Sequence, residues 1–435
     1  MWLRKLSAVS SLIHGFGYSL IACQAAYLAT YFPSIYWNTA YLRVVSGMDT
    51  DDTANYDKIA RAIGDIQKHG VSVSTIDVNK SGETFEPDED NNLILYGMRA
   101  LNGVGGDVTQ QIIANRPYKN VTEFVEKNNP NKSVMISLIK AGAFDEFHDR
   151  VTCMRWYLTR CSEPKKKITL ANFQGLIDKG LVDDNMAFCK RLYVFNKSLR
   201  GKCKHGDFYR VTGRYMTFYE QFFDTDELEI VDGETMIAQK KWQKMYTKAM
   251  EPAKKWIADE QEDILKKFNG SLFQEQWNKY ALGTQLTWEM DSLGFYSHGH
   301  ELEGVDKKMY GVSNFEDLPE EGYRNSARIQ GTVIAKNDMK SSVAVLTPEC
   351  GVVDVKFNRD AYASYNRRIS EVKQDGTKTC IEEGWFSKGT LLFIDGYRRG
   401  NMFVARAPRG GNMLYKIVGI DGRGCVACVS ERADA

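Results

Sequence analysis

The chain of 435 residues is too long for one ordinary hydrophobic core, and its length indicates two to four domains. With 43% hydrophobic and 26% charged residues it is typical of globular proteins, which excludes a disordered chain. Its 57 Lys and Arg against 56 Asp and Glu leave a net charge of +1, so the overall charge neither requires nor excludes a nucleic-acid partner.

The apolar first segment permits two interpretations. The stretch LIAC, ending at Cys23, has the small-residue pattern of a bacterial lipoprotein cleavage site, which would place a lipid on that cysteine. However, His14 and two glycines interrupt the apolar run, and after Cys23 the chain stays apolar and aromatic where a lipoprotein has a polar tether. We therefore favour a folded segment over an envelope lipoprotein.

As a helix, this segment places Tyr18, Ile21 and Leu28 on one face, with other apolar residues around it. That pattern predicts a largely buried helix, ended by Pro33, with a second helix starting near Ser34. The run is too weakly hydrophobic for a membrane span.

The next elements are a polar loop and a helix. Asp49, Asp51 and Asp52 lie in the loop, residues 49–55, and we assign them no metal. The spacing predicts a helix over residues 56–69, closed by Gly70, and then extended chain with turns up to residue 85.

Residues 93–116, LILYGMRALNGVGGDVTQQIIANR, have a helix-hairpin-helix pattern. Glycine tolerates the positive φ angles that turn N–H groups outward, and the N-terminus of the following helix attracts anions. Such backbone contacts hold DNA without reading its sequence. We expect Asp107 to cap this helix, because a carboxylate pointing at a phosphate would repel it. The expected DNA-binding residues are Gly103, Val104, Gly105 and Gly106.

A second unit, SVMISLIKAGAFD, follows at residues 133–145. A lone glycine bend is more often only a tight connection between helices, but the tandem pair favours DNA binding. We include Lys140 and Gly142 among the expected contacts, although the second bend, with one glycine, also fits a purely structural role.

Residues 151–304 are predicted to be mainly helical, with a long pattern over residues 239–270 that Pro252 should kink or split. The Met and aromatic residues at helical spacing there indicate a core, and the small lysine clusters fit solvated faces as well as phosphate contacts.

From residue 325 the period changes to that of strands. Five short strands with a helix between the third and fourth predict an oligonucleotide/oligosaccharide-binding (OB) barrel at residues 305–410, followed by a tail at 411–435. Such barrels bind strands with basic side chains and aromatic platforms, although alternate aromatic residues also fill a small barrel. The expected DNA contacts are Lys336, Lys340, Lys356, Phe357, Tyr397, Arg398 and Phe403.

Residues 14–33, HGFGYSLIACQAAYLATYFP, resemble the end of the fingers domain of bacterial family C replicative DNA polymerases, the DNA polymerase III alpha subunits. The resemblance implies nucleotide- or template-side roles for His14, Tyr18 and Gln24. Two positions depart from the family pattern: Ile13 replaces a Ser, and Ala29 replaces a Lys.

Three later stretches are similar to the same family in the same order: GVSVSTIDVNKS at residues 70–81, LIKAGAFD at 138–145 and LGFYSHGHEL at 293–302. The resemblance thus implies an α+β multidomain chain. Its expected parts are the end of the fingers at 1–48, tandem helix-hairpin-helix motifs at 49–150, a helical insert at 151–304 and an OB domain at 305–410.

The family also carries an internal peptide that binds the sliding clamp, just upstream of the LGFY element. Leu272 and Phe273 match its two apolar anchors, although Asn269 stands where the peptide begins with Gln. A possible clamp partner is thus implied, while an ordinary buried helix end remains the alternative.

Polymerisation itself needs metal ions held by palm-domain aspartates, which lie upstream of the fingers in this family. We find no such acidic cluster, and we expect no catalytic residue, metal or cofactor in this chain. The expected partners are DNA and a separate palm-bearing chain that holds Mg²⁺. The expected location is the cytoplasm of a bacterial or phage-infected cell. Alternatively, the chain is a fragment of a polymerase or a non-catalytic DNA-binding accessory protein.

The nine scattered cysteines favour free thiols in a reducing compartment. Cys425 and Cys428 form the lone CxxC pair, and without a second pair at zinc-site spacing we expect no zinc there. For His298 and His300 we expect hydrogen bonding or packing before metal binding.

Overall fold

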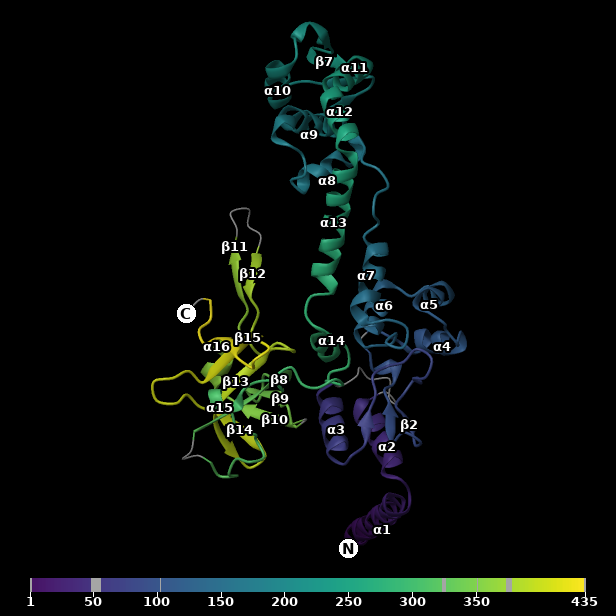
Figure 1. Ribbon diagram of the computed structural model, residues 1–435, viewed down its shortest axis with the longest axis vertical. Helices are drawn as coiled ribbons and strands as arrows, with labels where there is room; N and C mark the ends of the chain where they lie inside the picture. Colours follow the sequence, from purple (N-terminus) through teal and green to yellow (C-terminus); the bar gives the residue numbers. More distant parts are fainter. Residues whose placement is uncertain are drawn as a thin grey trace. The chain divides into compact units, whose positions relative to one another are not determined.

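The computed structural model describes residues 2–47, 56–101, 103–322, 326–349, 351–372 and 378–433. The chain folds into two units, one made of residues 1–154 and 283–435 and the other of residues 155–282. Helices and strands occur in both, so the expected α+β multidomain architecture is confirmed (Figure 1). The loop with Asp49, Asp51 and Asp52 lies outside the described residues.

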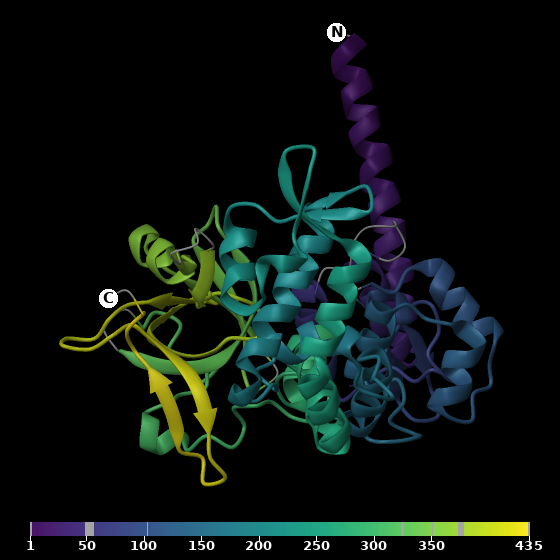
Figure 2. The ribbon, with the colours of Figure 1, turned by 90° about the horizontal axis from the view of Figure 1, so that it is seen from above.

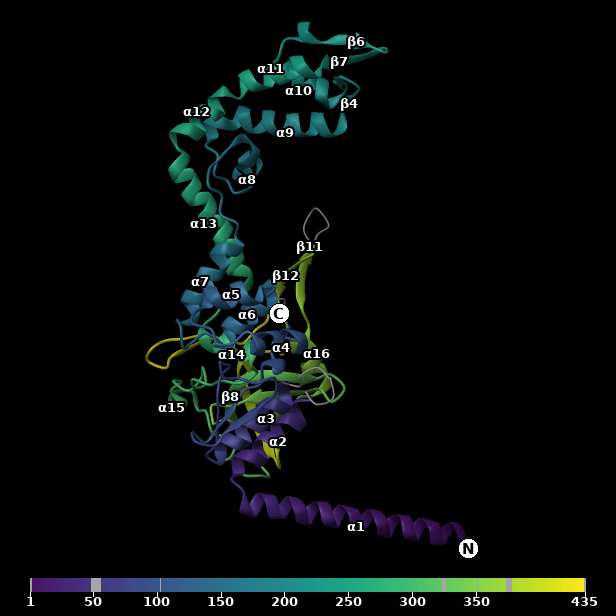
Figure 3. The same cartoon turned by 90° about the vertical axis from the view of Figure 1, so that its right-hand side faces the viewer.

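The chain begins with one long helix, α1 (Trp2–Tyr31), and Pro33 separates it from α2 (Ser34–Ser46). Both helices were predicted, but the burial of the first was not correct. Tyr18 is 71% and Ile21 62% exposed, and α1 is drawn as a projecting rod in Figure 3. Apolar residues on several faces suggested a buried helix, yet the spacing of residues cannot specify which neighbour covers them.

Helix α3 (Tyr56–Lys68) buries Ile59, Ile63 and Ile66, as their spacing predicts. The extended segment after it contains a small mixed sheet in the order β1-β3-β2. Its strands are β1 (Ser72–Val73), β2 (Glu86–Asp88) and β3 (Leu93–Leu95).

The helix-hairpin-helix region is a compact group of short helices. Asn120 and Asn131 cap two of them by accepting hydrogen bonds from the N–H groups of Glu123 and Val134. The elements are η2 (Met98–Ala100), α4 (Gly106–Ala114), α5 (Val121–Asn128), α6 (Lys132–Lys140) and α7 (Arg150–Cys161), the last of which runs into the second unit.

The chain re-enters the first unit through α14 (Gln285–Ser292), which leads into the LGFY element and then to the short α15 (Lys307–Tyr310). Phe295 of this element stacks on Tyr96, with ring centroids 5.7 Å apart, and the Tyr96 hydroxyl donates to the Leu293 carbonyl at 2.8 Å. These contacts fix the element against the segment after β3.

The predicted OB barrel is present. Strand β8 pairs with β9, β9 with β10, β10 with β14 in parallel, β14 with β13, and β13 with β8, which closes a five-stranded barrel. The strands are β8 (Ala327–Asn337), β9 (Ser342–Leu346), β10 (Val352–Lys356), β13 (Leu391–Arg399) and β14 (Met402–Ala405). Helix α16 (Arg359–Asn366) lies between the third and fourth.

Two hairpins extend the barrel beyond the prediction. β11 (Ile369–Val372) pairs with β12 (Lys378–Glu382) between α16 and β13. The residues expected to form a tail contain β15 (Leu414–Ile420), which pairs with β13, and β16 (Val426–Val429), which pairs with β15; these strands belong to the yellow C-terminal part in Figure 2. The tail prediction is thus corrected, because buried Leu414 and Ile417 give β15 an apolar face.

The second unit combines helices with a four-stranded antiparallel sheet that the sequence pattern did not indicate, in the order β4-β5-β7-β6. Its longer helices are α8 (Phe173–Asp178), α9 (Ala187–Lys202), α10 (Arg214–Phe222), α11 (Gln239–Ala249), α12 (Glu251–Asp259) and α13 (Gln261–Tyr280). Short 3₁₀ turns are η3 (Leu170–Asn172), η4 (Asp184–Met186) and η5 (Thr225–Glu227). The strands are β4 (Lys204–His205), β5 (Phe208–Arg210), β6 (Glu229–Val231) and β7 (Glu234–Ala238).

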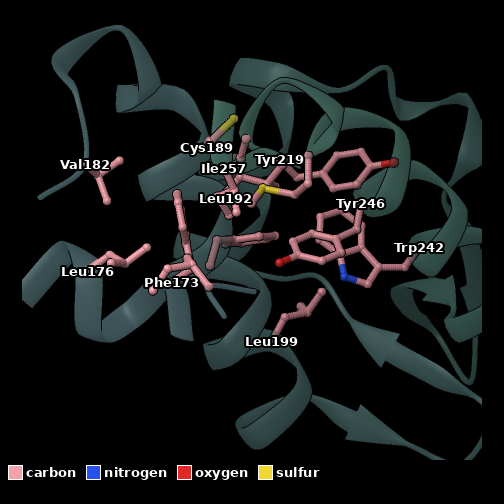
Figure 4. Close-up of a cluster of buried hydrophobic side chains, with 14 of the residues drawn as sticks. Phe173, Leu176, Val182, Cys189, Leu192, Leu199, Tyr219, Trp242, Tyr246 and Ile257 are labelled. Carbon is pink, nitrogen blue, oxygen red and sulfur yellow. The ribbon is translucent and has the colours of Figure 1, made fainter. Parts of the chain in front are cut away.

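Pro252 splits the predicted long helix, since it occupies the first turn of α12, where its missing N–H is not needed. The unit has its own aromatic core, in which Trp242 and Tyr246 of α11 lie against Leu192 and Leu199 of α9 (Figure 4). The Met and aromatic stripes are therefore core, as expected.

Within the described part of the chain, every helix is too short or too polar to span a membrane.

Candidate nucleic-acid interface

The first glycine bend has the geometry expected for a backbone contact. Gly103 has φ +81°, a conformation that L side chains rarely adopt, and Gly105 directly precedes α4 with φ −81° and ψ 170°. Gly103 and Gly105 are exposed, whereas the Val104 side chain is buried and anchors the bend.

The space on the side-chain side of Gly105 is open. A Cβ atom built on Gly105 meets no heavy atom within 4 Å, so no side chain or backbone atom would hinder a phosphate on that side. The N-terminal turn of α4, starting at Gly106, follows at once and adds N–H groups and the positive end of the helix dipole.

Asp107 does not cap α4. The helix is preceded by Gly105 without a side-chain cap, and Asp107 lies exposed in the first turn. Glu83 also lies close, 3.5 Å from a Cβ built on Gly106, but it forms an ion pair with Arg99 at 3.3 Å. Asp107 is acidic and Arg99 is paired with Glu83, so the backbone N–H groups are the contacts that we expect for a phosphate here.

The second bend is structural. Gly142 has φ +84° and is buried, and a Cβ there would lie 2.4 Å from the Arg150 guanidinium and 2.6 Å from the Asp145 carboxylate. Lys140 forms an ion pair with Asp291 at 3.2 Å, and its side chain is only 18% exposed. The prediction that Lys140 and Gly142 contact DNA is therefore wrong. Gly142 is buried, and the Lys140 side chain is paired with a carboxylate of the protein.

The barrel carries an open groove of about 720 Å³ on the outer face of β9, β10 and β14. Five cationic side chains line it, against the single carboxylate of Asp354. The cations are Arg61, Lys336, Lys340, Lys356 and Arg399. The structure thus brings three predicted lysines together in one place.

Polar contacts hold several of these side chains over the groove. Lys336 Nζ donates to Asn366 Oδ1 at 2.8 Å, and Lys356 Nζ donates to the backbone carbonyl of Lys340. Arg61, from α3, lies 2.6 Å from the Asp354 carboxylate. Among the described residues, no carboxylate lies within ion-pair distance of Lys340 or Arg399, so the groove keeps an excess of positive charge.

Three predicted barrel contacts are wrong. Phe357 and Phe403 are 3% and 0% exposed, because side chains alternate between the two faces of a strand and these two point into the barrel. Arg398 is also buried, where its Nη1 donates to the carbonyls of Phe315, Glu316 and Leu318. Tyr397 is half-buried beside Arg406, outside the groove lining.

Comparisons with known proteins bear on the helix-hairpin-helix part of this interface. A family model described as a helix-hairpin-helix motif matches residues 70–153. A probable DNA polymerase of Bacillus subtilis strain 168 is 34% identical over 473 aligned residues, covering 99% of this chain, and a DNA-directed DNA polymerase of Bacillus phage SPbeta matches equally well. The chain is a relative of the family C DNA polymerases.

The DNA polymerase III alpha subunit of Campylobacter jejuni is 33% identical over 142 residues, which are 31% of this chain and 11% of that protein. The chain covers 36% of the length of each of the two Bacillus relatives, about a third.

The predicted fingers residues are not gathered into a site. Tyr18 and Gln24 are exposed on α1, and the side chain of His14 lies outside the described part of the structure. Their family C role stays a prediction.

The two residues predicted to bind the clamp lie in the middle of α13, away from its ends. Leu272 packs partly against the core of the second unit, and the Phe273 ring lies 5.7 Å from that of Trp277. They therefore lie on a helix and not in a free peptide. Clamp binding stays a prediction.

The paired histidines have protein partners. His300 is 7% exposed; its Nδ1 accepts from the Leu302 N–H at 3.0 Å, which places the proton on Nε2, 3.0 Å from the Leu346 carbonyl. Burial lowers the pKa of His300 to about 4. His298 Nδ1 lies 2.5 Å from Glu289 Oε1.

The described cysteines, Cys425 and Cys428 among them, are free thiols. Across the residues that the structure describes, no group of three or more His, Cys, Asp or Glu side chains is arranged to hold a metal ion.

Sequence reasoning missed Arg61. It lies on a helix that the pattern assigned to the region before the first hairpin, and only the packing of α3 against the barrel brings it to the groove, where it meets Asp354. No local signal in the sequence indicates such a contact.

Proposed function

We propose that this chain is the DNA-binding portion of a family C DNA polymerase that acts in DNA replication, together with a separate chain that carries the palm. The observation that carries this proposal is the cationic groove on the OB barrel, with five basic side chains against one carboxylate. OB barrels bind single-stranded DNA in a basic groove that runs across their β-strands.

The two parts of the interface suit different forms of DNA. The backbone at Gly103 and Gly105 would hold the phosphates of a duplex through contacts that do not depend on sequence. The groove, with Lys336, Lys340 and Lys356, suits the single-stranded template beyond the duplex. Together they would keep the primer and template in place during synthesis.

The chemistry would be done by the partner chain. Nucleotidyl transfer requires carboxylates that hold Mg²⁺ at the attacking and leaving oxygens, and in this proposal these belong to the palm of the partner. The residues described here would position DNA and would make no contact with the reacting atoms. The place of action would be the cytoplasm of a bacterial or phage-infected cell.

The groove is tested by changing Lys336, Lys340 and Lys356 together to Gln and measuring fluorescence anisotropy of a labelled single strand at several salt concentrations. Loss of three phosphate contacts should reduce the slope of log K against log salt by about 2. Changing Lys266, Lys308 and Lys378 to Gln removes the same charge outside the groove and should leave the slope nearly unchanged. Equal effects of the two triple variants would contradict a groove-specific contact.

The split arrangement is tested by primer extension with the purified palm-bearing chain, with and without this chain. Longer products per binding event in the presence of this chain support the proposal. If this chain binds DNA yet never alters extension by a palm-bearing chain, it is a DNA-binding accessory protein instead.

A further inference from the structure

A second cationic pocket lies in the unit of residues 155–282, and none of its residues belongs to the barrel or the glycine bends. It has a volume of about 360 Å³, within the range of pockets that hold one small ligand. Its walls come from three elements: η3, α9 and α11. The lining residues used below are Leu170, Tyr193, Asn196, Lys197, Arg200 and Tyr246.

Helix α9 divides its side chains between the core and the pocket. Leu192 and Leu199 are fully buried in the aromatic core of the unit. Tyr193, Lys197 and Arg200 follow at positions i, i+4 and i+7 and so share another face of the helix, toward the pocket. Because the face of α9 with Leu192 and Leu199 is buried in the core, the face with Tyr193, Lys197 and Arg200 points toward the pocket.

The cations of this pocket have not been neutralised by neighbours. Lys197 and Arg200 are exposed, and within the described residues no carboxylate lies at ion-pair distance from either side chain. The pocket lining contains no Asp or Glu. Lys166 and Lys167 are exposed and precede η3 in the chain, although neither belongs to the pocket lining.

The interior of the pocket is aromatic and well supported. The Tyr193 ring, half-buried, rests edge-to-face on Phe173 with centroids 5.5 Å apart, beside Leu170. Tyr246 forms the back, and the buried Asn196 is held by the Trp242 indole N–H, which donates to its Oδ1 at 2.9 Å. Figure 4 shows Tyr246 and Trp242 side by side in this core. A flat ring entering the pocket would find an aromatic surface already in place.

We propose that this pocket binds one nucleotide of a single DNA strand, with Tyr193 as the surface for the base and Lys197 and Arg200 as the contacts for the phosphodiester. An aromatic ring next to unpaired cations is the combination that single-stranded nucleic acid binding requires, because stacking accepts any base and the cations follow the backbone. The second unit would thus add a strand-binding site separate from the barrel groove.

The test uses the whole chain with the barrel groove weakened by changing Lys336, Lys340 and Lys356 to Gln, so that the second site contributes a larger share of the binding. Binding of labelled oligo(dT) is followed by anisotropy at several salt concentrations. Adding Lys197→Gln with Arg200→Gln should weaken binding about tenfold at low salt and reduce the salt slope by about 1.4, for two lost contacts with a single strand.

Two further variants separate charge from stacking. Tyr193→Leu keeps an apolar side chain but removes the ring, and it should weaken binding about fivefold while leaving the salt slope unchanged. Lys255→Gln with Lys266→Gln removes two exposed charges of the same unit outside the pocket and should change neither quantity. Equal losses in the pocket and control variants would overturn the proposal.

Competition identifies the source of the phosphate. Inorganic phosphate should displace the strand only weakly because it has no base, and thymidine triphosphate should do so only weakly because it lacks the continuing backbone of a strand. If thymidine triphosphate at micromolar concentration displaces the strand completely, the pocket is a nucleotide site and the proposal is overturned. Since the barrel lysines are already changed in this background, a failure here leaves the proposed role of the barrel groove untouched.

Discussion

The guanidinium of Arg150 and the carboxylate of Glu289 lie 3.0 Å apart, with side chains that are 2% and 0% exposed. Arg150 also binds the Asp145 carboxylate and the Lys140 carbonyl, so it covers the second glycine bend and joins it to α14. This buried pair connects the helix-hairpin-helix region to the element that leads into the barrel.

Glu289→Gln should destabilise the first unit by about 3 to 5 kcal/mol, because it leaves the Arg150 charge buried with one partner fewer. Hydrogen exchange of the amides in α6 and α14 measures the loss. Asp291→Asn, on the same helix, breaks the more exposed pair with Lys140 and should cost about 1 kcal/mol or less. A similar cost for the two substitutions would show that burial adds nothing to the Glu289 pair.

Burial of Glu289 would by itself raise its pKa, but the Ser297 N–H and the Arg150 charge more than offset it and hold the pKa below 4.5. A depressed carboxylate pKa stabilises the fold above the unfolded value and loses that contribution as the pH falls through the folded value. The part of the stability that depends on the ionised Glu289 should therefore be complete at pH 6 and be lost as the pH falls below 4.5 through the folded value, a pH dependence that the Gln variant should lack.

His300 should make the first unit acid-sensitive in a higher pH window. Its pKa falls from 6.5 to about 4 on burial, and protonation of Nδ1 would oppose the Leu302 N–H that donates to it. The folded state therefore loses stability as the pH drops from 6.5 toward 4, by about 2 kcal/mol between pH 7 and 5.

Thermal unfolding at pH 7, 6 and 5 measures this loss. His300→Gln cannot titrate, so its stability should change less with pH over that range than that of the parent, even if it is lower throughout. Parallel curves for the two proteins would rule out His300 as the source.

The glycine bend at residues 103–105 should bind duplex DNA through its backbone N–H groups. Gly105→Val places a side chain where nothing lies within 4 Å and where φ is ordinary, so the fold should survive while the approach of a phosphate is blocked. Duplex affinity should fall about tenfold, the equivalent of about 1.4 kcal/mol, as measured by gel shift at moderate salt.

Gly142→Ala supplies the comparison. That residue is buried at φ +84° under Arg150, so the substitution should lower stability but leave the duplex affinity of the remaining folded protein unchanged. If Gly105→Val leaves the affinity for duplex DNA unchanged, the backbone at Gly105 does not contact DNA.

Leu272 and Phe273 test the clamp-binding prediction. If α13 presents a clamp-binding surface, Phe273→Ala should reduce synthesis only when the sliding clamp is present, as measured by primer extension with a palm-bearing chain. Leu272→Ala should additionally destabilise the second unit by about 2 kcal/mol, because Leu272 packs partly against its core. Equal losses with and without the clamp would indicate structural effects alone.

The sequence by itself determined the elements whose signals are local. Glycine at 103 and 105 predicted a bend before α4, the spacing of Ile59, Ile63 and Ile66 predicted the buried face of α3, and strand alternation predicted the five strands of the barrel. Each of these depends on the backbone conformation of one residue or on a period of a few residues. Residues close together in the sequence are enough to determine both.

Only the tertiary structure decided which side chains are available to DNA. Closure of the barrel buries Phe357 and Phe403. Arg398 is buried because it donates to three backbone carbonyls, and α3 brings Arg61 to the groove from a distant part of the chain. The exposure of α1 and the Lys140 ion pair with Asp291 have the same origin. A side chain faces solvent or core according to what packs against it, and those neighbours are far away in sequence.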